Sequence, residues 1–116
     1  MLFDSTKILY DRDGRPVIEP EVGADGKIVD NKFRTLTHGI VAVRALDAKM
    51  PGDDDLKPED VRKRWMLGTK ILGSDLAEIT ASEASLITDR VVHFGTSIAG
   101  PIIHALDNPP SKKQSK

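Results

Sequence analysis

The stretch from Ile79 to Leu106 constrains the fold more than any other part of this sequence. It opens with Thr80-Ala81-Ser82-Glu83, a capping box in which the Thr hydroxyl and the Glu carboxylate each accept a backbone N–H of the first helical turn. Apolar residues then recur at steps of three and four: Ala84, Ile87, Val91, Phe94, Ile98, Ile102 and Ala105. This spacing predicts one long helix, or two collinear helices, bent near Pro101.

Two more helices are expected upstream of this stretch. Apolar residues from Leu36 follow a helical period to about Lys49, and Pro58 with two acids after it is typical of a helix start. The four expected helices cover residues 36–49, 58–72, 82–95 and 97–107. In the second of them Trp65 lies in the middle of an apolar stripe. We therefore expect Trp65 to be buried against the last helix, so that Trp65→Ala would cost about 3–5 kcal/mol.

The first 34 residues lack helical periodicity and contain two Asp-Gly pairs, Asp13-Gly14 and Asp25-Gly26, which favour tight turns. They predict one or two small hairpins, or a partly ordered extension. Because an isolated hairpin is marginally stable in water, this arm is expected to dock on the helices or on a partner.

The expected fold class is mainly α, a small domain of three to four helices with an N-terminal β-hairpin arm. The arm covers residues 1–34, the helical domain 35–107 and a tail 108–116. The tail has no apolar residue beyond its prolines, so it is expected to be disordered and dispensable for folding.

Composition excludes several kinds of chemistry. The chain has no cysteine, which rules out disulfides, thiolate catalysis and Cys-ligated zinc. Its 17 basic and 18 acidic residues give a net charge of −1, without a global attraction to nucleic acid or to an anionic membrane. There is no signal-peptide pattern and no apolar run of about 20 residues. We therefore expect a cytoplasmic protein with no membrane partner.

The candidate catalytic and metal-binding residues are better explained by ordinary structural roles than by a catalytic or metal site. No two of His38, His93 and His104 are three or four residues apart, the spacing that places two ligands on one ion, so we interpret all three as ordinary surface or boundary residues. Asp53-Asp54-Asp55 and Asp11-Arg12-Asp13 lack the glycine and glutamate positions of a calcium loop and are interpreted as a solvated loop and a turn. No serine has a nucleophile-elbow context, and the Gly95–Gly100 segment lacks the lysine of a phosphate loop. The sequence predicts no enzyme, no cofactor and no metal site.

The order of these elements resembles small tailed-bacteriophage and prophage proteins. The resemblance covers about residues 35–107, and the residues that carry it are Thr35-Leu36-Thr37, Ala45-Leu46, Lys63-Arg64-Trp65, Lys70-Ile71, Ile79 to Glu83, Leu86-Ile87 and Pro101-Ile102-Ile103. It implies a phage-derived origin and carries over no catalytic residue. We therefore expect a non-enzymatic interaction, structural or assembly protein, found in the host cytoplasm or in the virion. Its partner would be itself, a phage protein or a host protein.

Two surfaces are candidates for contacts. A second apolar strip on the last helical stretch, through Leu86, Val92 and Ile103, favours a homo-oligomer or a contact with another protein, unless the other helices and the arm cover it. The alternative function is a DNA-associated regulator that uses the basic residues of the second helix. These are Arg62, Lys63, Arg64 and Lys70. Consecutive residues of a helix point about 100° apart, so this set does not form one tight patch.

Overall fold

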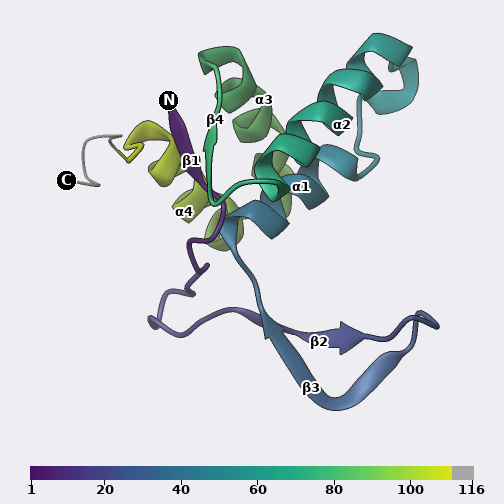
Figure 1. Cartoon of the computed structure of the whole chain (residues 1–116), viewed down its shortest axis with the longest axis vertical. Helices are drawn as coiled ribbons and strands as arrows, with labels where there is room; N and C mark the ends of the chain where they lie inside the picture. The colour runs from purple at the N-terminus through teal and green to yellow at the C-terminus, as the bar shows by residue number, and fades with distance from the viewer. Residues whose placement is uncertain (111–116) are drawn as a thin grey trace.

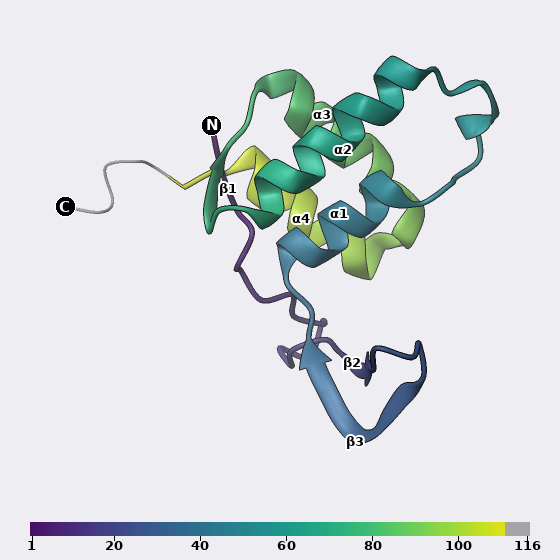
Figure 2. The ribbon, with the colours of Figure 1, turned by 45° about the vertical axis from the view of Figure 1, so that its right-hand side comes forward.

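The computed structural model describes residues 1–110 of the chain as a helical body with a projecting hairpin. The body contains four helices: α1 (His38–Asp47), α2 (Pro58–Leu72), α3 (Ala81–Val91) and α4 (Thr96–Asp107). Short 3₁₀ turns are η1 (Asp53–Asp55) and η2 (Val92–Phe94), and the strands are β1 (Leu2–Asp4), β2 (Ile18–Val22), β3 (Ile28–Thr35) and β4 (Leu76–Glu78). Figures 1 and 2 both show β2 and β3 extending away from the packed helices.

The start of α3 confirms the capping box. The Thr80 hydroxyl accepts the Glu83 N–H at 3.1 Å, and the Glu83 carboxylate accepts the Thr80 N–H at 2.9 Å. The expected continuous or collinear helix is wrong, because the chain turns at Gly95, which has a φ of 89°. That conformation interrupts the helical hydrogen bonds, so α4 folds back and packs against α3. Pro101 lies inside α4.

The beginning of the chain belongs to the helical body. Strand β1 pairs antiparallel with β4, with Phe3 opposite Ala77, and Phe3 and Leu9 are both buried in the core. The expected 1–34 arm is therefore not one unit: its first residues belong to the body, whereas the β2–β3 hairpin projects from it. The four helices and the N-terminal hairpin confirm the expected elements, and with a second two-stranded sheet the fold is mixed α and β rather than purely helical.

Aliphatic side chains from all four helices and from the first residues of the chain form the core. The largest fully buried ones are Leu9, Leu67, Ile71, Ile79, Ile87, Val91 and Ile102. The prediction that Trp65 is buried is wrong, because its side chain is 67% exposed. Helix α2 buries the face of Leu67, Gly68 and Ile71, and at 100° per residue Trp65 lies beside that face.

The acidic loop after α1 is not simply a solvated loop. Asp53 is 7% exposed and accepts hydrogen bonds from Arg90 Nη1 and Nη2, both at 2.9 Å. Arg90, itself 5% exposed, also donates to the carbonyl of Ala45 at 3.0 Å. Asp53 further accepts the Met50 N–H at 2.7 Å. These hydrogen bonds, first those from Arg90, hold the pKa of Asp53 far below its usual value. The network connects α3 to the end of α1 and to the loop that follows it.

Residues 111–116 lie outside the described part of the chain, and with them most of the tail that was expected to be disordered.

A candidate interaction surface on the hairpin

The β2–β3 hairpin has two chemically different faces. Antiparallel pairing places Ile18 opposite Thr35, Glu19 opposite Arg34, Pro20 opposite Phe33 and Val22 opposite Ile28. Residues that are directly opposite share a face, and neighbours along a strand alternate between faces. Ile18, Pro20, Val22, Ile28, Phe33 and Thr35 therefore share one face, whereas Glu19 and Arg34 lie on the other.

The polar face points toward the helical body. Glu19 accepts a hydrogen bond from Arg34 at 2.6 Å and from Nη1 of Arg44 on α1 at 2.6 Å, with a second contact to Nη2 of Arg44. The hydrogen bond from Arg44 is the main cause that lowers the pKa of Glu19 to about 2. Two residues before Glu19, on the same side of the strand, Val17 packs against the core. These contacts fix which face is turned outward.

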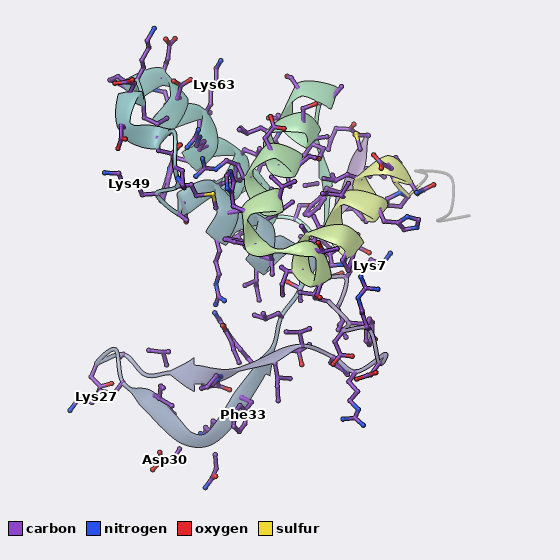
Figure 3. All side chains as sticks on the ribbon, turned by 180° about the vertical axis from the view of Figure 1, so that it is seen from behind. Lys7, Lys27, Asp30, Phe33, Lys49 and Lys63 are labelled. Atoms are coloured by element: carbon purple, nitrogen blue, oxygen red, sulfur yellow. The ribbon has the colours of Figure 1, made fainter. Side chains whose placement is uncertain are left out.

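The opposite face is apolar and exposed. We use the name hairpin face for Ile18, Val22, Ile28 and Phe33, whose exposed fractions are 56%, 62%, 65% and 55%. Figure 3 shows Phe33 on the arm, well away from the helices. Exposed apolar residues are ordinary when they are single, but a contiguous group of large ones is typical of a contact site.

A bulge in β3 limits how a partner could use the strand edge. The register shifts between Pro20 and Val22, and Asn31 has a positive φ of 61°. An irregularity of this kind interrupts the row of unpaired N–H and C=O groups that another strand would pair with. The face of the hairpin is therefore a better contact surface than its edge.

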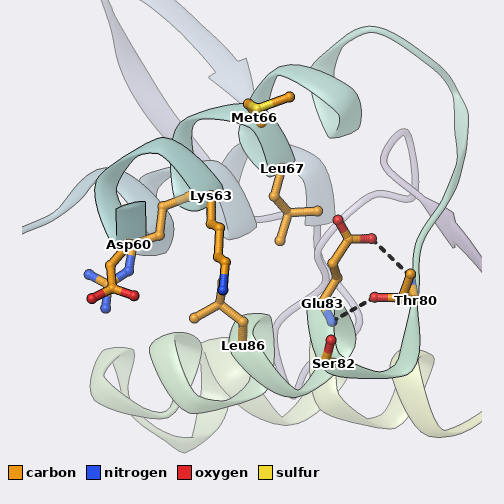
Figure 4. Close-up of a pocket in the computed structure, with 9 residues that line it drawn as sticks. Asp60, Lys63, Met66, Leu67, Thr80, Ser82, Glu83 and Leu86 are labelled. Atoms are coloured by element: carbon orange, nitrogen blue, oxygen red, sulfur yellow. Dashed lines mark hydrogen bonds between the residues drawn. The ribbon is translucent and has the colours of Figure 1, made fainter. Parts of the chain in front are cut away.

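The residues of the expected apolar strip lie in three different elements. Leu86 of α3 and Ile103 of α4 are partly buried against the core, and Val92 of η2 is 51% exposed. Leu86 also lines a groove of about 530 Å³ between α2 and α3. Figure 4 shows Leu86 in this groove together with Lys63 and Met66 of α2.

Two of the four basic residues proposed for nucleic-acid contact are engaged in ion pairs. Arg64 contacts Asp53 at 3.2 Å, and Lys70 contacts Glu83 at 2.8 Å. Arg62 and Lys63, the other two, are exposed and form no ion pair within residues 1–110. This pairing reduces the positive field that phosphate binding would need.

The histidines do not form a metal site. Within residues 1–110, no group of three or more His, Cys, Asp or Glu side chains could hold an ion. His38 is 2% exposed, and its Nδ1 has no hydrogen-bond partner in the described residues. Burial, and next the charge of Lys7, lowers the pKa of His38 to about 4. His38 is therefore neutral at pH 7. Its burial also shows that its interpretation as a surface or boundary residue is wrong.

The sequence predicted that the arm docks on the helices or on a partner, but not which of its residues form an exposed apolar face, although a signal for that face is present. Ile18, Pro20 and Val22 alternate with two glutamates, which is the period of a strand with one apolar face. The direction of that face depends on the pairing of Glu19 with Arg44, 25 residues away.

Comparison with known families found no matching family model, and comparisons with curated proteins and with solved structures found no match either. Among the described residues, no helix combines the length and the apolar character that crossing a bilayer requires.

Proposed function

We propose that this protein is a non-enzymatic interaction protein that acts in assembly and contacts a protein partner through the hairpin face. The observation that carries the proposal is the outward apolar face of Ile18, Val22, Ile28 and Phe33, each more than half exposed. A hairpin that served only to complete the fold would turn this face toward the helices. Here the face toward the helices carries Glu19 instead.

The physical cost of this arrangement supports a contact function. A two-stranded hairpin alone is marginally stable in water, and an exposed apolar face contributes nothing to folding until it is covered. The Glu19–Arg44 ion pair attaches the arm to α1 in one orientation. A partner that covered the hairpin face would supply the missing burial.

The resemblance to small tailed-bacteriophage proteins supports assembly as the process. On this proposal the protein acts in the cytoplasm of a bacterial host during particle assembly, or as a component of the virion.

The proposal can be tested with tagged protein and two aspartate variants of similar exposure. Ile28→Asp changes the hairpin face, and Val92→Asp changes an apolar residue of the body that is 51% exposed. Proteins captured from phage-producing bacteria would be compared by mass spectrometry. Burying a carboxylate in an apolar contact costs at least about 2 kcal/mol, so capture by Ile28→Asp should fall roughly 30-fold. Capture by Val92→Asp should match the wild type.

Equal capture by the wild type and Ile28→Asp would contradict the proposal. So would a loss that Val92→Asp shares, because the contact would then lie on the body.

A further inference from the structure

We propose that the hairpin face binds the same face of a second copy of this chain, so that two hairpins pack as a two-layer β-structure around a two-fold axis. This inference rests on the proposed function and names its partner. It also moves the expected self-association from the Leu86, Val92 and Ile103 strip to the hairpin.

The composition of the face supports a second copy. All six positions on this side of the hairpin are uncharged. A two-fold axis brings identical patches together, and an uncharged apolar patch can meet itself without burying an unpaired charge. Two such sheets pack about 10 Å apart with interdigitated side chains.

The charges around the face also suit a two-fold contact. Asp25 and Lys27 lie at the turn, and Asp30 and Lys32 lie in the bulge of β3. Figure 3 shows Lys27 and Asp30 on the arm with Phe33. A rim of one sign would repel its own copy. This rim carries one acid and one base in each segment, so a rotated copy can place opposite charges together.

The exposed area is close to what a dimer needs. Each of the four side chains is more than half exposed. For large apolar residues this corresponds to an exposed area of roughly 100 Å² or more per side chain. Two faces in contact would remove on the order of 1,000 Å² from water, near the lower limit for a specific interface. We therefore expect a reversible dimer with a dissociation constant in the micromolar range.

The polar face explains why the contact stops at two copies. Glu19 and Arg34 on that side are already bonded to each other, and Glu19 is also bonded to Arg44 of α1. Only one face of each hairpin is therefore open, and the helical bodies lie outside the pair.

Disulfide cross-linking tests the geometry directly, because the natural chain has no cysteine. One cysteine per chain would be introduced at Ile18, Val22, Ile28 or Phe33. Trp65→Cys serves as the matched control, since Trp65 is 67% exposed and Ile28 is 65% exposed. Under mild oxidation at tens of micromolar protein, at least one hairpin variant should form covalent dimer about tenfold faster than Trp65→Cys.

Sedimentation of the cysteine-free protein gives a second measurement. The wild type and Val92→Asp should change from monomer to dimer as concentration rises through the micromolar range, whereas Ile28→Asp should stay monomeric. Circular dichroism would establish that each variant keeps its helices.

Two results would overturn the face-to-face dimer. One is a hairpin cross-linking rate no higher than that of Trp65→Cys. The other is cross-linking only in mixtures of Ile28→Cys with Trp65→Cys, because the arm would then dock on α2 of the next copy. If Ile28→Asp nevertheless lost a different captured protein, the interaction function would stand and the second copy would not be its partner.

Discussion

The helical body and the hairpin place charged and apolar residues in opposite ways. The body buries a carboxylate, Asp53, against Arg90, whereas the hairpin exposes four large apolar side chains. In the body, the buried polar contacts connect α1, α3 and the loop between α1 and α2. The hairpin uses one ion-paired residue, Glu19, to direct its apolar face outward. On our proposal the body carries the folding free energy, and the hairpin carries the contact with a partner.

The largest effect on the body should come from its buried ion pair. Arg90→Leu removes four hydrogen bonds, two to Asp53 and one each to the carbonyls of Ala45 and Ala48, and leaves the carboxylate of Asp53 in a buried position. Removing one partner of a buried pair is strongly destabilising, so we expect the melting temperature to fall by more than about 10 °C. Arg62→Leu, at an exposed position of α2, is the control and should change it by about 2 °C or less. Similar melting of both variants would show that the network contributes little.

A smaller effect should follow the protonation of His38. Its pKa is about 4 in the folded protein and about 6.5 when unfolded, so between these values the unfolded chain binds more protons. Stability is then fully present above pH 6.5 and falls as the pH is lowered to 4, by on the order of 3 kcal/mol. Urea denaturation across this range should show the loss in wild type and in His104→Leu, whose histidine is exposed. His38→Leu should lose markedly less, and an unchanged slope in that variant would contradict the assignment.

Local signals in the sequence predicted the local structure well. The capping box at Thr80 and the proline at Pro58 gave helix starts that the structure confirms within a residue. The expected helices 82–95 and 97–107 placed a break next to Gly95, but the change of direction there was not predicted, because the apolar period continues across it. A period shows which side chains share a face, but it does not show whether the axis turns.

Long-range pairing explains most of what the sequence did not predict. Asp53 and Arg90 are 37 residues apart, and no local pattern connects them. A hint was available, since Arg90 lies between Ile87 and Val91, both fully buried, and so shares the buried side of α3. The prediction for Trp65 was wrong for a related reason. The apolar residues of α2 span a wider face of the helix than α1 covers, and only the packing decides which of them are buried.

The smallest effect on stability should be that of Trp65→Ala. Its exposed side chain leaves little cavity when it is removed, so unfolding should change by less than about 1 kcal/mol rather than the 3–5 kcal/mol expected for a buried Trp. Chemical denaturation of the variant would measure this, with Leu67→Ala on the buried face of α2 as comparison. A loss as large as that of Leu67→Ala would mean that Trp65 packs against the body in solution.

Hydrogen exchange at two protein concentrations tests the difference between the two regions most directly. Amide protection reports the free energy of local opening, and the body should be equally protected in dilute and concentrated samples. The amides of residues 18–35 should exchange fast in dilute protein and become at least about tenfold slower when the contact forms. Protection of the hairpin that is independent of concentration and of added partner would contradict the account, because the arm would then be stabilised by the body alone.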